Sequence, residues 1–223
     1  MSYGTAFETW RGASPEWDAY TRHTFVSGLG NGSLPREAFL HYLRQDYVFL
    51  VHFSRAWALA VVKAGTLAEM KQAAGTVDAL VNHEMRLHVE TCAAAGISQA
   101  ALEATREEAE NLAYTRYVLE AGFSGDFLDL MAALAPCVLG YGEIGARLGR
   151  EATSDAYGDW IGTYAGSEYQ DLCKDVGALI DQALVERLGD TWAETPRARG
   201  LRDRFATATR REVGFWDMGL RGA

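Results

Sequence analysis

The chain has 223 residues and a formal net charge of −9, and it is 48% hydrophobic and 23% charged. This length can bury a substantial core, and the composition is typical of a globular protein rather than a disordered one. The acidic balance, without a basic stripe, argues against a nucleic-acid partner. No run approaches about 18 uninterrupted apolar residues, so we expect no membrane span. Three cysteines without a CxxC pair, and an N-terminal segment unlike a leader, predict a reduced, cytoplasmic protein.

Helical patterns follow one another along the whole chain. They are expected over residues 14–26, 34–63, 66–96, 99–121 with a break near Ala104, 125–149, 154–166, from 167 onward, and 196–220. Capping boxes are predicted at Thr66–Glu69 and Ser167–Gln170. No alternating stretch bounded by turn signals predicts a strand. We therefore expect an all-α fold of seven to eight helices, organised as a single domain over residues 1–223.

The long helix expected over residues 34–63 has a carboxylate on its apolar stripe. That stripe consists of Phe39, Leu43, Phe49, Leu50, Phe53, Trp57 and Ala60, at steps of three and four residues. Asp46 falls in the middle of it. A carboxylate facing the core must be paired or hydrogen-bonded, because an isolated buried charge costs several kcal/mol. From this helix alone, a structural and a functional role are equally open.

The last helix repeats this feature at Glu212. Its inner face is formed by Leu201, Phe205, Ala208, Phe215, Trp216 and Gly219, and Glu212 falls among them. Two inward carboxylates on distant helices, each ringed by aromatic residues, indicate a polar pocket in a helical core. Apolar walls raise the pKa of such a group and suit it to proton transfer near neutral pH.

The apolar run over residues 134–145 contains Cys137 directly after Pro136. The proline is expected to kink the helix and could aim the thiol into a cavity. Tyr141 lies one turn after Cys137 and shares its helix face, while Tyr114 and Tyr164 lie on other aromatic-rich helices. For each tyrosine, core packing and ligand contact both remain open. Cys92 and Cys173 occupy apolar helical positions and are expected to be packing residues.

In combination these residues resemble the TenA/thiaminase II family of aminopyrimidine aminohydrolases. The resemblance covers nearly the whole chain and is carried by RQDYVFLVHFSRA, AYTRYVLEAG, GDFLDLMAALAPCVLGYGEIG, WIGTYAGSEY and RREVGFWDMGL. The Pro-Cys-x-x-x-Tyr element and the Glu-x-x-Phe-Trp ending are its most specific parts. The resemblance implies a heme-oxygenase-like helical bundle, a homotetramer, and neither a metal nor an organic cofactor.

The resemblance also implies a hydrolysis in thiamin salvage, with 4-amino-5-aminomethyl-2-methylpyrimidine, thiamin or an N-formyl derivative as substrate. It makes Cys137 the nucleophile, Asp46 the group that orients the ring, and Glu212 the group that transfers protons. Its remaining substrate-binding positions are Phe49, Tyr114, Tyr141, Tyr164 and Phe215. Family members often carry Tyr where this chain has Phe49, so stacking is kept and a hydroxyl contact is lost.

Three other functions were weighed against this one. A metal site is suggested by NHEMRLHVE, with His83, Glu84, His88 and Glu90, but only Glu84 and His88 share a helix face, and a solvated or subunit-facing helix is favoured there. A cofactor-free oxidase on the same fold would require several His and Arg residues around a polyanionic substrate, whereas the candidate pocket offers Asp, Glu, Tyr and Cys. A metal-dependent oxidase would require a second Glu-x-x-His element on another helix, which the sequence lacks. A non-catalytic binding module gives no reason for three inward polar groups.

Overall fold

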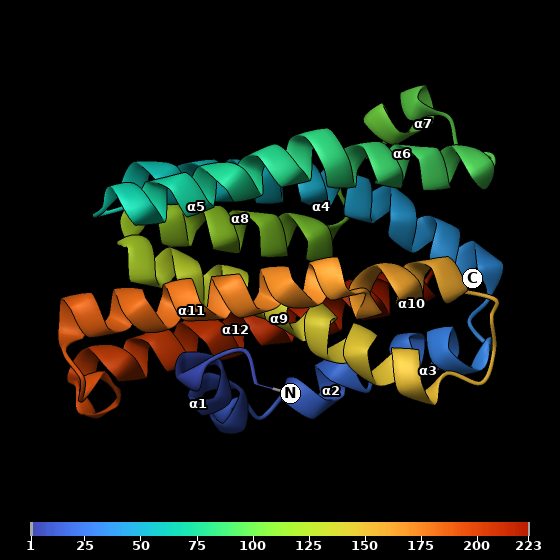
Figure 1. Cartoon of the computed structure of the whole chain (residues 1–223). Helices are drawn as coiled ribbons and strands as arrows, with labels where there is room; N and C mark the ends of the chain where they lie inside the picture. The colour runs from blue at the N-terminus through green and yellow to red at the C-terminus, as the bar shows by residue number, and fades with distance from the viewer. Residues whose placement is uncertain (1, 223) are drawn as a thin grey trace. The chain divides into compact units, whose positions relative to one another are not determined.

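The computed structural model describes residues 2–222, and within this range every regular element is helical (Figure 1). The elements are α1 Thr5–Ala13, α2 Trp17–Thr21, α3 Thr24–Asn31, α4 Arg36–Lys63, α5 Leu67–Asp78, the π-helix η1 Ala79–Glu84, α6 Met85–Ala94, α7 Gln99–Glu103, α8 Ala109–Ser124, α9 Phe127–Glu151, α10 Gly158–Ala165, α11 Ser167–Leu188, the 3-10 turn η2 Trp192–Glu194 and α12 Pro196–Leu220. The all-α fold class is confirmed, with more and shorter helices than expected.

Contacts divide the chain into two compact units. Unit 1 comprises the residues up to Leu34 together with Met131–Trp216, and unit 2 comprises Pro35–Leu130 and the residues from Asp217 onward. Unit 1 is therefore built from two distant parts of the sequence. A single domain over residues 1–223 stays a prediction.

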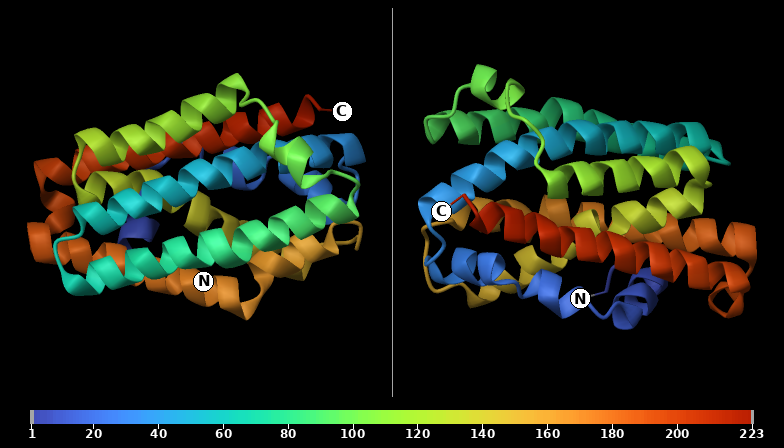
Figure 2. Two further views of the ribbon diagram at one scale, coloured as in Figure 1. Left: turned by 90° about the horizontal axis from the view of Figure 1, so that it is seen from above. Right: turned by 180° about the vertical axis from the view of Figure 1, so that it is seen from behind.

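Unit 2 is built around α4. In Figures 1 and 2, α5, η1 and α6 follow one another as a single rod beside α4, and α8 also packs on α4. The capping box at the start of α5 is confirmed: the Glu69 amide donates to the Thr66 hydroxyl at 3.2 Å, and Glu69 Oε2 accepts from the Thr66 amide at 3.3 Å. The expected break near Ala104 is also confirmed, since α7 ends at Glu103.

In unit 1, α9 admits close neighbours at glycines. A Cβ atom at Gly140 would lie 2.4 Å from the Tyr20 ring, and one at Gly145 would lie 2.4 Å from the Tyr164 backbone. The missing side chains at these glycines therefore let other parts of the protein approach α9 closely. The most apolar 18-residue window of α9 has a mean hydropathy of 1.4, and 89% of it is buried, so α9 passes a length-and-composition test for a membrane span but is packed as a core helix.

The helix starts of unit 1 differ from expectation in three places. α1 was not expected; Asp181 of α11 caps it by accepting from the amides of Thr5 and Ala6, each at 2.7 Å. The helix expected over residues 14–26 is instead α2 and α3, because the His23 ring accepts from the Phe25 amide and starts a new helix. The capping box expected at Ser167–Gln170 is wrong: α11 begins there without a side-chain cap, since Gln170 bonds elsewhere.

Candidate active site

Cys137 and Tyr141 lie one turn apart on the unit 1 part of α9, as predicted. The Cys137 side chain is half-buried, whereas Tyr141 is buried. α9 continues through Pro136, whose carbonyl oxygen accepts from the Tyr20 hydroxyl at 3.2 Å. This bond fixes the backbone next to Cys137 to a residue of α2. Of the three cysteines, Cys137 alone keeps some solvent access.

A set of aromatic rings surrounds Tyr141 in unit 1. The Tyr141 ring lies 5.0 Å from that of Tyr164 and 5.4 Å from that of Trp216, between centroids. Trp160 packs on Tyr164 at 4.6 Å. Aromatic contacts of this kind are worth about 0.5–1.5 kcal/mol each beyond the area they bury. The structure thus brings together two predicted site tyrosines. It adds Trp160, for which no role was predicted, and Trp216, which was predicted only as part of the inner face of the last helix.

Glu212 and Phe215 lie on the inner face of α12, as predicted. Glu212 is 1% exposed and Phe215 is 2% exposed. The neighbouring Trp216 packs on Tyr141, which connects this stretch of α12 to the aromatic rings of α9 and α10. Both residues belong to unit 1, as do Cys137, Tyr141 and Tyr164.

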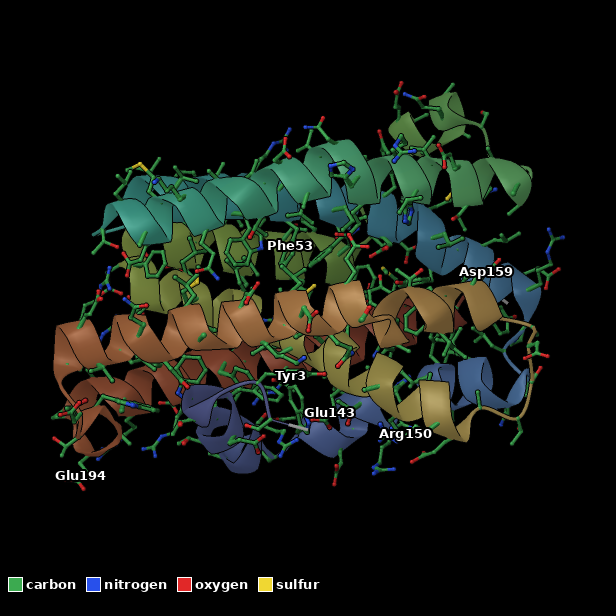
Figure 3. All side chains as sticks on the ribbon, in the orientation of Figure 1. Tyr3, Phe53, Glu143, Arg150, Asp159 and Glu194 are labelled. Carbon is green, nitrogen blue, oxygen red and sulfur yellow. The ribbon has the colours of Figure 1, made fainter. Side chains whose placement is uncertain are left out.

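Gln170 connects three segments of unit 1 through its amide. The Tyr3 hydroxyl, labelled in Figure 3, donates to Gln170 Oε1 at 2.6 Å. Gln170 Nε2 donates to the carbonyl oxygens of Gly142 at 2.9 Å and Tyr164 at 2.8 Å. Each acceptor belongs to, or adjoins, a predicted site tyrosine. Sequence reasoning had given Gln170 only a capping role.

Asp46 lies in unit 2 and is buried, as its place on the apolar stripe predicted. Burial raises the pKa of its carboxyl to about 7, and a hydrogen bond from Tyr42, one turn earlier, partly opposes that rise. The rest of the stripe is also buried, except Phe39, which is half-buried.

His88 and Glu84 face Asp46 from a stretch, NHEMRLHVE, that is otherwise largely exposed, so the expectation of a solvated or subunit-facing helix holds there except at these two residues. His88 Nδ1 lies 3.6 Å from Asp46 Oδ2, and His88 Nε2 lies 2.8 Å from the Leu43 carbonyl oxygen. Burial, and then the charge of Asp46, raise the pKa of Glu84 to about 7. The shared helix face of Glu84 and His88 was the available signal, but their partner on α4 was not apparent from the sequence. Within residues 2–222, no group of three His, Cys, Asp or Glu side chains is arranged to hold a metal ion.

Phe49 and Tyr114, the other predicted site residues of unit 2, contact each other. Their ring centroids lie 5.0 Å apart, and Phe49 also stacks on Phe53 at 5.4 Å. Tyr114 is 1% exposed. The two rings join α4 to α8.

Cys92 and Cys173 are packing residues, as expected. Both are fully buried, and burial raises the pKa of Cys92 to about 11 and that of Cys173 to about 12. Thiols with such pKa values are almost entirely protonated at neutral pH and unreactive as nucleophiles.

The fold and these side chains define an all-helical protein with polar groups buried among aromatic rings, the construction of a small-molecule enzyme. The sequence matches the TENA/THI-4/PQQC family over residues 10–222, and the chain belongs to that family.

Three relatives illustrate the match. The chain is 66% identical, with a TM-score of 0.97, to a structure described as a TenA family transcription regulator from Silicibacter sp. TM1040, covering 98% of this chain and 97% of that one. It is 38% identical to an uncharacterized protein of Haemophilus influenzae, covering 93% and 95% of the two chains. It is 37% identical to the aminopyrimidine aminohydrolase of Halalkalibacterium halodurans, covering 92% and 91%.

Proposed function

We propose that the protein is a hydrolase of carbon–nitrogen bonds, an aminopyrimidine aminohydrolase that converts 4-amino-5-aminomethyl-2-methylpyrimidine to the hydroxymethyl compound in thiamin salvage. The observation that carries this proposal is the half-buried Cys137 one turn from Tyr141, in a chain 37% identical to an aminopyrimidine aminohydrolase. Asp46 and Glu212, both buried, supply the acid groups that the reaction requires.

In the proposed reaction the Cys137 thiolate adds to an electron-poor carbon of the pyrimidine ring. Glu212 protonates the amine as its bond to the exocyclic carbon breaks, and then takes a proton from the water that attacks that carbon. Loss of the thiolate restores the ring, so one difficult displacement becomes two easier steps and ammonia is the second product. Asp46 accepts from the amino group of the ring and orients it. Phe49, Tyr114, Tyr141, Tyr164 and Phe215 supply apolar and hydroxyl contacts.

The nucleophile is tested by Cys137→Ser, with Cys173→Ser as the matched control. We expect Cys137→Ser to lower kcat by about a thousandfold or more, because serine is not activated as a thiolate is, while the circular dichroism spectrum and Tm stay near those of the parent protein. Cys173→Ser should keep its turnover. Full activity of Cys137→Ser on the aminomethyl compound would refute the nucleophile assignment.

We also propose that the protein assembles as a homotetramer. Exposed apolar side chains in unit 2 support this: Val62 is 76% exposed, Phe123 70% and Leu67 65%. Exposed apolar groups in such number are typical of surfaces that bind other proteins. Light scattering during size-exclusion chromatography measures the assembly, and a monomer would contradict the proposal.

A further inference from the structure

Two titratable side chains next to Asp46, His88 and Glu84, have no part in the reaction described above. The His88 side chain is 8% exposed and the Asp46 side chain is 9% exposed, so water contributes little to their interaction. A buried carboxyl and a buried imidazole that face each other must share a proton or bond to other polar groups, because an unpaired buried polar group is costly.

The orientation of the His88 ring fixes its tautomer. Its Nε2 atom lies 2.8 Å from the carbonyl oxygen of Leu43, and a carbonyl oxygen only accepts hydrogen bonds. Nε2 therefore carries a hydrogen. Leu43 and Asp46 belong to the same helix, α4, so the anchor of the ring and the carboxyl it faces keep a fixed spacing.

The other ring nitrogen, Nδ1, is consequently directed at Asp46 Oδ2, 3.6 Å away. In the neutral ring Nδ1 is an acceptor, and an ionised Asp46 would place a second acceptor opposite it. A proton on Oδ2 removes this conflict, and a small rotation of either side chain that shortens the 3.6 Å separation by a few tenths of an ångström completes the hydrogen bond. Burial raises the pKa of Asp46 and lowers the pKa of His88, which favours the form in which the Asp46 hydroxyl donates to Nδ1.

The remaining groups that face Asp46 do not replace His88. The Tyr42 hydroxyl, from α4, donates to the carboxyl. Glu84, from η1, is a second acid that competes with Asp46 for a proton. Cys92, from α6, is a protonated thiol. Burial and the charge of Asp46 raise its pKa, and Arg44 opposes that rise by a smaller amount. Of these groups, His88 alone combines a ring nitrogen 3.6 Å from Asp46 Oδ2 with an uncharged acceptor for the Asp46 proton.

We propose that His88 is a positioning residue that holds the shared proton on Oδ2, so that Asp46 presents only acceptors to the amino group of an aminopyrimidine. This inference rests on the proposed function, in which Asp46 orients the ring. Without His88 the proton could occupy either carboxyl oxygen, and a hydroxyl directed at the substrate would oppose its N–H groups.

The kinetic test compares KM in the parent protein and in His88→Phe across pH. At about pH 6 we expect the KM of His88→Phe to be about tenfold higher than that of the parent protein, because roughly one hydrogen bond to the substrate is lost. The change in kcat should be smaller. Near about pH 8.5 the rise should shrink to about threefold or less, because Asp46 is then ionised in both proteins. His88→Asn, whose amide can return an acceptor near the Nδ1 position, should recover part of the loss. The exposed neighbour His83→Gln is the control and should match the parent.

An equal rise of KM at both pH values, or a loss confined to kcat, would overturn the assignment, because a merely structural role has no reason to follow the Asp46 proton. The ¹⁵N spectrum of the histidine rings gives a readout that needs neither activity nor a variant that folds poorly. We expect the His88 signal to show a hydrogen on Nε2 and a hydrogen-bonded Nδ1 that shifts in Asp46→Asn. A hydrogen on Nδ1 alone would refute the proposal.

These results also separate the two proposals. A protein with the expected spectrum that turns over none of the candidate pyrimidines would refute the proposed function and leave the Asp46–His88 pair standing. Turnover with the wrong tautomer would refute the pair alone.

Discussion

The two units hold their polar groups by different means. In unit 1, Tyr141 lies among tilted and edge-on aromatic rings, and the backbone beside Cys137 and Tyr141 accepts hydrogen bonds from the neutral donors Tyr20 and Gln170. In unit 2, Asp46 lies against His88 and Glu84, whose own protonation is perturbed. In unit 1 the neutral hydrogen bonds at Tyr20 and Gln170 form a frame, and in unit 2 Asp46, His88 and Glu84 form a cluster whose charge changes with pH. A substitution in the frame should change stability equally at acid and alkaline pH, whereas a substitution in the cluster should not.

The sharpest contrast lies within unit 1, between its two thiols. With iodoacetamide at about pH 8, we expect Cys137 to be alkylated at least about a hundredfold faster than Cys173, because a thiol with a pKa of about 12 is ionised in only about one molecule in ten thousand. Cys92, in unit 2, should be similarly protected. Peptide mass spectrometry measures the three rates. Denaturation in urea is the control, and it should make them alike; fast labelling of Cys173 in the folded protein would contradict the packing assignment.

The frame of unit 1 is tested by Gln170→Met, which keeps the approximate volume and removes the amide. The hydroxyl of Tyr3 and the carbonyl oxygens of Gly142 and Tyr164 each lose a buried partner, so the free energy of unfolding should fall by about 2–3 kcal/mol, with little dependence on pH. Urea titrations at acid and alkaline pH measure this. Gln182→Met, exposed on the same helix, should change stability by under about 0.5 kcal/mol. If the loss of stability in Gln170→Met depended strongly on pH, the proposed difference between the frame of unit 1 and the cluster of unit 2 would be wrong.

The cluster of unit 2 is tested by Glu84→Gln. The folded-state pKa of Glu84, about 7, lies above the value of the unfolded chain, so folding favours the protonated acid and stability falls as pH rises toward and through about 7. Removing the charge should therefore stabilise the protein by about 1–3 kcal/mol at about pH 8.5, and hardly at all near about pH 4.5. Glu90→Gln, an exposed position on α6, is the control. If Glu84→Gln were no more stable than the parent protein at alkaline pH, the Glu84 carboxylate would be solvated and its burial would be refuted.

Much of the fold was predictable because the relevant signals are local. The apolar stripe located Asp46, the inner face of α12 located Glu212, and the capping box marked the start of α5. What the sequence did not reveal depends on distant partners. α1 is capped by a residue of α11, and His88 is oriented by a carbonyl oxygen of α4. A helical wheel shows which side chains share a face, but it does not show which residues pack against that face.

The Ser167–Gln170 error has the same cause. The spacing of a capping box is present, yet the amide of Gln170 is used by two carbonyl oxygens and a tyrosine hydroxyl from other segments. Local propensity was overruled by three bonds formed only in the folded chain. The roles of Cys137, Asp46 and Glu212 came from the resemblance to a family, and they stay predictions until the variants are measured.

The cap on α1 also has a consequence for the order of events during synthesis. The amides of Thr5 and Ala6 leave the ribosome long before their acceptor, Asp181, which is translated 175 residues after Ala6. Over that interval all of Pro35–Leu130, the larger part of unit 2, emerges and can become compact before the residues of α1 meet their partner. A nascent chain stalled before Asp181 should therefore expose its first helix to proteases, and one stalled well beyond it should protect that helix.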